Sequence, residues 1–222
     1  MKRYFLAAFI IFSGAELVTT WFNLPQWQAF SKPFLVPSLI GYYVFSCSKR
    51  PLSIAFMLAL FFCWVGDVLL MFESYFIFGL LAFLTGHLLF TAAWRQHRNP
   101  ATPDSLTGLQ RLRMAFPVVL YATGMVVVLY PHLDRLRVPV VLYAGVLAFM
   151  VLQALFRYGR TSAASFGWVF AGSVLFMVSD SLLAFNKFIG PVAHSGFWIM
   201  LTYISAQLLM VQGVISHASE SQ

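Results

Sequence analysis

Residues 52–72 read LSIAFMLALFFCWVGDVLLMF, and a single carboxylate, that of Asp67, stands in this otherwise apolar run. A run of about 20 mostly apolar residues is long enough to cross the hydrocarbon core of a bilayer as one α-helix. An ionised carboxylate is costly to hold in hydrocarbon, so an acidic residue inside a membrane helix usually faces a partner or a cavity. The stretch therefore predicts a membrane helix that carries a functional group.

The rest of the chain has the same apolar character. Of its 222 residues, 60% are hydrophobic and 9% are charged, whereas a soluble domain carries roughly 25% charged residues. A chain of this size cannot bury so much apolar surface in its own core, so much of that surface must face lipid. The net charge of +7 comes from basic residues at the ends of apolar segments, a distribution typical of membrane topology rather than of nucleic-acid binding.

The apolar segments predict an all-α membrane helix bundle that forms one integral membrane domain over residues 1–222. Eight transmembrane helices are expected, at roughly residues 4–22, 34–47, 52–72, 75–94, 114–130, 138–156, 164–186 and 192–215. The first begins like a signal peptide, but its apolar stretch continues past Glu16 to Phe22, which favours a membrane helix. The short alternating segments of a membrane β-barrel do not occur in the sequence, which leaves helices.

Basic residues are distributed unevenly between the predicted sides of the membrane. Ten are expected on the side of both termini: Lys2, Arg3, Lys49, Arg50, Arg95, Arg98, Arg111, Arg113, Arg157 and Arg160. Four are expected on the other side: Lys32, Arg135, Arg137 and Lys187. By the positive-inside rule both termini are cytoplasmic. A bacterial inner membrane is the favoured location, with the endoplasmic reticulum as the alternative for a eukaryotic chain.

A weak internal repeat relates the two halves of the chain, which a predicted cytoplasmic loop at residues 95–113 separates. GDVLLMF at 66–72 and SDSLLAF at 179–185 share the pattern Asp-x-Leu-Leu-x-Phe. Because four helices per half is an even number, the halves would be two parallel four-helix repeats about an axis along the membrane normal. Such an arrangement would place Asp67 and Asp180 facing each other across the bundle.

Three acidic residues, Glu16, Asp67 and Asp180, are predicted to lie within membrane helices. Each has a structural interpretation, a carboxylate that pins two helices through a hydrogen bond, and a functional one, a group that faces a cavity. The structural interpretation is strongest for Glu16, which lies on a polar stripe with Ser13 and Thr20.

Helical spacing brings further polar side chains onto shared faces. One face of helix 75–94 carries Gly79, Phe83, Gly86 and His87, and one face of helix 192–215 carries Tyr203 and Gln207. One side of helix 164–186 is predicted to carry Gly172, Phe176, Ser179, Asp180, Leu183 and Lys187. His87 and Tyr203 should lie one turn deeper than the two aspartates, with a core histidine and a packing aromatic as the plain alternatives. Helices 114–130 and 138–156 have few polar residues and are predicted to be scaffold.

Taken together, these residues resemble the YhhN-type lysoplasmalogenase family of eight-helix membrane hydrolases. The matching pieces are Lys32-Pro33, Gly66-Asp67, GLLAFLTGHLLF at 79–90, GSVLFMVSDSLLAFNKF at 172–188 and YISAQ at 203–207. The resemblance implies hydrolysis of the vinyl-ether bond of a lysoplasmalogen, which gives a fatty aldehyde and a glycerophospho-ethanolamine or -choline. The implied partners are the lysophospholipid substrate and membrane lipid.

The acidic residues suit this chemistry. A vinyl ether hydrolyses by protonation at its β-carbon, and water then attacks the oxocarbenium ion. Two carboxyl groups in one apolar cavity supply the acid and the stabilising anion, because repulsion keeps one of them protonated. Asp67 and Asp180 are thus the predicted catalytic pair.

The remaining polar side chains would assist the pair. His87 and Tyr203 would orient the water or the carboxylates. The predicted substrate-binding residues are Lys32, Lys187, Ser179, Gln207 and Glu16, with the two lysines on the phosphate. Lys32 has a plain alternative as a lysine that snorkels to the interface. The reaction requires no metal and no other cofactor.

Two other functions remain open from the sequence. In a metal-dependent lipid hydrolase, Asp67, Asp180, His87 and His194 would bind zinc, although the two histidines are predicted at different depths and catalytic zinc takes three protein ligands. In a proton-coupled small-molecule transporter, the two aspartates would carry protons across a repeat interface.

Overall fold

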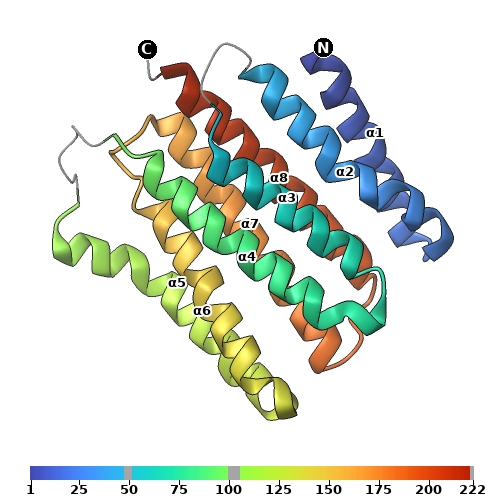
Figure 1. The fold of residues 1–222 in the computed structure, drawn as a ribbon. Coiled ribbons are helices and arrows are strands. Elements are labelled where there is room, and N and C mark those ends of the chain that lie inside the picture. The colour runs from blue at the N-terminus through green and yellow to red at the C-terminus, as the bar shows by residue number, and fades with distance from the viewer. Residues whose placement is uncertain (48–51, 100–105, 221–222) are drawn as a thin grey trace. The chain divides into compact units, whose positions relative to one another are not determined.

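The computed structural model describes residues 1–47, 52–99 and 106–220, and these are all-helical (Figure 1). The described residues form α1 (Lys2–Trp21), α2 (Pro25–Ser46), α3 (Ile54–Leu69), α4 (Phe76–Gln96), α5 (Gly108–Leu129), α6 (Arg137–Leu155), α7 (Ala163–Phe188) and α8 (Ser195–Glu220). Three 3-10 turns, η1 (Glu73–Tyr75), η2 (Tyr130–His132) and η3 (Asp134–Leu136), lie in the connections. The all-α prediction is confirmed. The chain forms two compact units, Met1–Ala93 and Trp94–Gln222.

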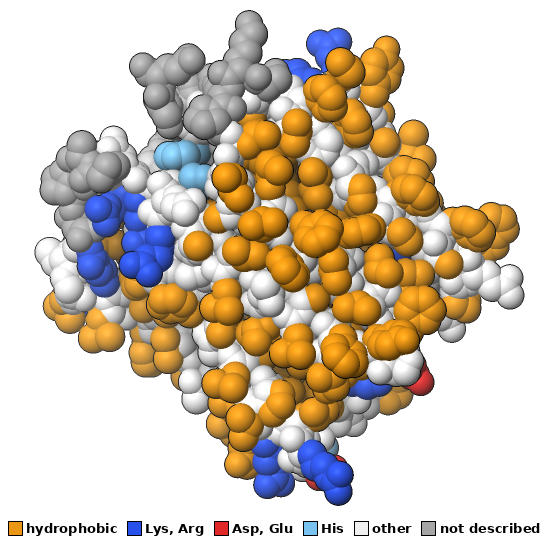
Figure 2. Space-filling view, viewed as in Figure 1, with side chains coloured by type: hydrophobic (Ala, Val, Ile, Leu, Met, Phe, Trp, Pro, Cys, Tyr) orange, Lys and Arg blue, Asp and Glu red, His pale blue; other side chains and the backbone are white. Residues whose placement is uncertain are grey.

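Within the described ranges, six helical segments are long and apolar enough to cross a membrane. They are Lys2–Trp21, Glu73–Gln96, Gly108–His132, Asp134–Leu155, Ala163–Phe188 and Ser195–Ala218. Large hydrophobic side chains remain exposed along them, and Figure 2 shows such side chains covering most of the visible face. Exposed apolar surface on this scale belongs against lipid. The chain is therefore an integral, multi-pass membrane protein.

Two predicted spans differ from this set. The predicted helix 52–72 is shorter in the structure, Ile54–Leu69. It begins at Ile54 because the Ser53 side chain caps its first turn by accepting from the Phe56 amide. The predicted helix 34–47 begins nine residues earlier, at Pro25, where proline suits the first helical position. The added turns of α2 are rich in polar residues, and α2 is not among the six.

The observed starts of two other helices also differ from the predicted starts, and local structure explains both differences. α5 begins at Gly108 rather than 114 because Thr107 and Gln110 form a capping box, each side chain bonding the other residue's backbone N–H. α8 begins at Ser195 rather than 192, after His194 in a left-handed conformation with φ of 52°. The predicted loop 95–113 thus shrinks to the stretch between α4 and α5. Residues 100–105 of it, with Asp104, lie outside the described residues, as do Lys49 and Arg50.

In the first unit, α1 packs on α2, and α2 packs on α3. Glycines bring α4 close to α3: a Cβ at Gly66 would lie 2.6 Å from the Phe83 ring, and one at Gly86 would lie 3.1 Å from Cys63 Sγ. Gly79 is similarly tight against the Leu70 side chain. Three of the four residues predicted to share a face of α4, Gly79, Phe83 and Gly86, therefore lie toward α3.

Two prolines lie inside α2, and α3 compensates for one of them. Pro37 has no N–H, so the carbonyl of Pro33 has no partner one turn on in the helix. The Trp64 indole of α3 donates to that carbonyl at 2.9 Å. This bond fixes α2 against α3 at the level of the Lys32-Pro33 pair.

In the second unit, α5 packs on α6, α6 on α7, and α7 on α8. The α7–α8 pair is the most extensive, and Figure 1 shows the two helices side by side. Glycines permit the approach on both sides: a Cβ at Gly172 would lie 2.8 Å from the Ala206 carbonyl oxygen, and one at Gly213 would lie 2.5 Å from the Val169 side chain. Backbones therefore meet closely along this pair, as small residues allow in membrane helices.

Candidate functional site

Asp67 lies in the last turn of α3 and is almost fully buried. The close contact of Gly66 with Phe83 fixes this turn against α4. His87 is fully buried one turn further along α4, with its ring centroid 6.5 Å from that of Phe83. His87 therefore lies one turn deeper than Asp67, as predicted. The first unit thus holds a buried acid and a buried imidazole on two helices in contact.

Glu16 is the second buried acid of the first unit, at 1% exposure. Its Oε2 accepts a hydrogen bond from the Ser31 hydroxyl of α2. The ammonium of Lys32, which is half-buried, attracts the same carboxylate electrostatically. Glu16 therefore pins α1 to α2, which is the structural interpretation of this residue.

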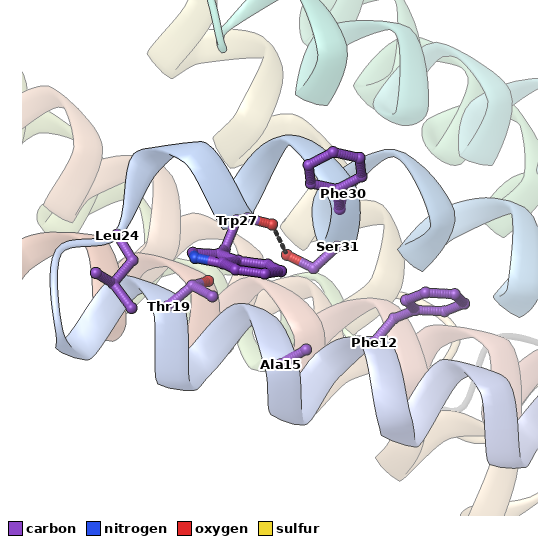
Figure 3. A pocket seen from close by; sticks show the side chains of 7 residues that line it. All are labelled: Phe12, Ala15, Thr19, Leu24, Trp27, Phe30 and Ser31. Atoms are coloured by element: carbon purple, nitrogen blue, oxygen red, sulfur yellow. Dashed lines mark hydrogen bonds between the residues drawn. The ribbon is translucent and has the colours of Figure 1, made fainter.

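A largely apolar cavity of about 320 Å³ lies between α1 and α2 (Figure 3). It is lined by Phe12, Ala15, Thr19, Leu24, Trp27, Phe30 and Ser31. The Ser31 hydroxyl lies 3.4 Å from the Trp27 carbonyl, the contact dashed in Figure 3. Because Ser31 also bonds Glu16, the cavity places an apolar surface directly beside a buried carboxylate.

Asp180 of the second unit is half-buried on α7, and its partner comes from α6. The Tyr143 phenol donates to Asp180 Oδ2 at 2.5 Å. The expectation that helix 138–156 is only scaffold is therefore wrong. Tyr143 was missed because an aromatic in an apolar helix resembles core packing. The available signal was that it is the one tyrosine in 138–156, while an intramembrane acid needs a donor.

The predicted polar side of α7 divides between two neighbouring helices. Ser179 donates to the Ile199 carbonyl of α8 at 3.0 Å, and the Phe176 ring meets the Tyr203 ring edge-on at 5.4 Å. Asp180 instead points to α6, because consecutive helical residues are about 100° apart. The pairing of Phe176 with Tyr203 confirms that Tyr203 lies one turn deeper than Asp180.

Tyr203 and Gln207 are neighbours on α8, as predicted from their spacing of one helical turn. Both side chains are buried, and Gln207 Nε2 donates to the Tyr203 phenol oxygen at 3.2 Å. Among the described residues, Gln207 Oε1 has no hydrogen-bond partner. A buried amide oxygen of this kind is available to accept from a bound hydroxyl group or water.

Two further candidate residues, Lys187 and His194, lie at helix ends. Lys187, in the last turn of α7, is exposed, as is His194 just before α8. No group of three or more His, Cys, Asp or Glu side chains with metal-binding geometry occurs in the described ranges. The zinc interpretation therefore gains no support from the side-chain arrangement.

Comparison with known proteins points to one family. The sequence profile of the YhhN family matches residues 27–214. Human lysoplasmalogenase TMEM86B is 33% identical over 148 residues, which cover 66% of this chain and 57% of that protein. Lysoplasmalogenase TMEM86A of Bos taurus is 30% identical over 190 residues, 82% of this chain and 72% of that protein.

A bacterial relative is similarly close. Lysoplasmalogenase of Mycobacterium tuberculosis is 31% identical over 140 residues, 62% of this chain and 50% of that protein. The chain therefore spans between half and three quarters of the length of these curated relatives. No solved structure matches it.

Proposed function

The chain belongs to the YhhN family, and from this premise we propose that it is a membrane hydrolase for the vinyl-ether bond of lysoplasmalogens. Curated relatives from mammals and mycobacteria carry the name lysoplasmalogenase at 30–33% identity. The products would be a fatty aldehyde and the glycerophospho-headgroup. The observation that supports the proposal is an acid in each unit: Asp67 of α3 is almost fully buried, and half-buried Asp180 of α7 accepts a hydrogen bond from the Tyr143 phenol of α6.

In the proposed mechanism the two aspartates have different roles. A donated hydrogen bond favours the charged form of a carboxyl group, so Asp180, which accepts from Tyr143, is assigned as the anion. Asp67, which is almost fully buried, is assigned as the acid. It transfers its proton to the β-carbon of the vinyl ether, and the oxocarbenium ion that forms is stabilised by the Asp180 carboxylate.

Water then completes the reaction. It adds to the oxocarbenium carbon and gives up a proton to the Asp67 carboxylate, which restores the acid. The hemiacetal that results collapses to aldehyde and alcohol with no net gain or loss of protons. His87 and Tyr203, each one turn deeper than an aspartate, are proposed to orient the water, and Gln207 Oε1 is a further acceptor for it.

Most of the residues proposed to contact the substrate lie in the first unit. The alkenyl chain of the substrate fits the chemistry of the α1–α2 cavity, whose lining is apolar apart from Thr19 and Ser31. Lys32 follows Ser31 on α2 and is proposed to bind the phosphate, with Glu16 holding this end of the cavity. Exposed Lys187 is a second candidate for the phosphate, and Ser179 for a polar contact near Asp180.

The finer topology is part of the same proposal. All eight helices are proposed to cross the membrane in one domain, with both termini cytoplasmic and two four-helix repeats in parallel. The favoured membrane is a bacterial inner membrane. Ten of the 14 basic residues lie on the predicted cytoplasmic side.

Aldehyde release from a lysoplasmalogen by detergent-purified protein tests the proposal. An ester-linked lysophospholipid is the substrate control, and a chelator arm tests the need for metal. Asp67→Asn and Asp180→Asn should lower kcat by about 10²–10⁴-fold, the usual contribution of general acid catalysis. Asp134→Asn, an exposed loop carboxylate, is the matched control and should keep the wild-type rate. Failure of folded protein to cleave the vinyl ether would refute the hydrolase and make proton-coupled uptake the next assay.

A further inference from the structure

A tryptophan of α3 is bonded to α2 directly beside the proposed phosphate ligand. The Trp64 indole N–H donates to the Pro33 carbonyl at 2.9 Å, and Pro33 follows Lys32 in the chain. Pro37 has no N–H, so the usual donor to this carbonyl from within α2 is missing. The Trp64 ring also contacts the Phe61 ring one turn earlier on α3, with centroids 5.7 Å apart. The backbone beside Lys32 is therefore tied to a side chain that α3 itself holds in place.

Helix α1 holds the same short segment of α2 from another side. The Ser31 hydroxyl donates to the buried Glu16 carboxylate of α1, and the Lys32 ammonium attracts that carboxylate. The helical bonding of α2 is incomplete here, because neither Pro33 nor Pro37 can donate to the carbonyl four residues earlier. Side-chain bonds to α1 and α3 thus fix the segment Ser31 to Pro33, where the backbone of α2 is least able to fix itself.

Asp67 lies three residues beyond Trp64 on α3. Three residues advance about 4.5 Å along a helix and return to nearly the same side of it. The consecutive helices α2 and α3 pack on each other and run in opposite directions (Figure 1). Because Lys32 comes before the bonded proline on α2 and Asp67 comes after Trp64 on α3, both lie on the same side of the bond. The bond therefore sets the depth of the proposed acid relative to the proposed phosphate ligand.

We propose that Trp64 is a positioning residue for hydrolysis, which holds Lys32 at a fixed depth relative to Asp67. This role rests on the function proposed above, because it takes Lys32 as the phosphate ligand and Asp67 as the acid. A substrate bound through its phosphate then presents its vinyl ether at the level of the acid. Such an arrangement is sensitive to small shifts, since a displacement of about 1 Å can cost about 10²-fold in rate. Trp64 itself contacts neither the substrate nor the transferred proton.

Trp64→Phe removes the indole N–H and keeps an aromatic ring on α3. For a lysoplasmalogen and the full-length detergent-purified protein, kcat should fall by about 10- to 100-fold and KM should stay within about twofold, because Lys32 still binds the phosphate but at the wrong depth. A 1-alkenylglycerol has the same vinyl ether and no phosphate, so the variant should cleave it at the slow wild-type rate. Adding Trp64→Phe to Lys32→Gln should not lower kcat further. Trp168→Phe, at an exposed tryptophan of α7, is the matched control.

A second variant separates positioning from stability. Pro37→Ala supplies the N–H that the Pro33 carbonyl lacks within α2, so Trp64→Phe combined with Pro37→Ala satisfies this carbonyl without joining α2 to α3. The combined variant should regain the Tm that Trp64→Phe loses, and its kcat should stay low when it is compared with that of Pro37→Ala alone.

The outcomes distinguish this role from the hydrolase activity itself. An equal loss of rate on both compounds, or recovery of kcat together with Tm in the combined variant, would show that the bond is only structural and would overturn the positioning role. A wild-type kcat for Trp64→Phe, or a further loss of kcat in the Lys32→Gln background, would overturn it as well. Cleavage of neither compound by folded wild-type protein would refute the proposed function, and the positioning role with it.

Discussion

Replacing Tyr143 by Phe removes the phenol hydroxyl that donates to Asp180 and leaves the aromatic ring of α6 in place. A hydrogen bond to a charged group contributes about 1.5–3 kcal/mol. Without this bond the anionic form of Asp180 is disfavoured by up to the same free energy, and only the anionic form stabilises the oxocarbenium ion. Since each 1.36 kcal/mol is a factor of ten in rate, kcat should fall by roughly 10- to 100-fold with KM little changed.

The assay is initial-rate aldehyde release over a range of lysoplasmalogen concentrations. Tyr121→Phe on α5 is the control, because the same hydroxyl is removed from an exposed side chain. A double-mutant cycle of Tyr143→Phe with Asp180→Asn, followed by Tm, measures the coupling in the folded protein independently of turnover. A wild-type kcat for Tyr143→Phe, together with effects on stability that add within about 0.5 kcal/mol, would refute the role given to this bond.

Three further predictions concern stability. Ser31→Ala leaves buried Glu16 without its donor and should cost about 1–3 kcal/mol, measured as a lower Tm in detergent; an unchanged Tm would contradict the pinning role. Gly172→Ala should cost about 1–3 kcal/mol by overpacking α7 against α8, whereas Gly124→Ala on α5, where a Cβ meets open space, should cost nothing; equal Tm values would argue against the close approach. Burial and neighbouring charges lower the pKa of His97 to about 3, so the unfolded chain binds a proton that the folded protein does not, and stability should fall as the pH falls from about 6.5 toward 3. His97→Gln should flatten that decline by up to about 1.4 kcal/mol per pH unit, and parallel pH curves for the two proteins would show that His97 does not titrate in this way.

The sequence predicted the helix class and much of the packing because membrane helices carry strong local signals. A 3.6-residue period places Gly79, Phe83 and Gly86 on one face, and α3 packs there. The same period predicted that Tyr203 and Gln207 are neighbours, and their side chains are hydrogen-bonded one turn apart. These are relations within one helix, where spacing alone decides which residues are neighbours.

Relations between helices were harder to predict. The bond from Tyr143 to Asp180 joins residues 37 positions apart, and nothing local to either residue indicates the other. The helix predicted to begin at residue 34 extends back to Pro25, and the carbonyl that Pro37 leaves free inside α2 is satisfied by Trp64 of α3, 31 positions from Pro33. The spacing also predicted that Ser179 and Asp180 lie on one side of α7. Adjacent residues of a helix differ by about 100° in direction, however, and these two side chains contact different helices, α8 and α6.

Helix α5 belongs to the least buried of the six candidate membrane spans, and of its 22 residues only Val118 and Leu129 are buried. Natural selection on such a helix acts mainly on hydrophobicity and length, because lipid tails accept any apolar side chain of similar size. Its sequence should therefore drift quickly between related proteins, with exchange among leucine, valine, isoleucine and phenylalanine at most positions. α7 and α8, where glycines set the distance between backbones, have far less freedom to vary. The rate of sequence change along the chain would then record which helices touch lipid and which touch protein.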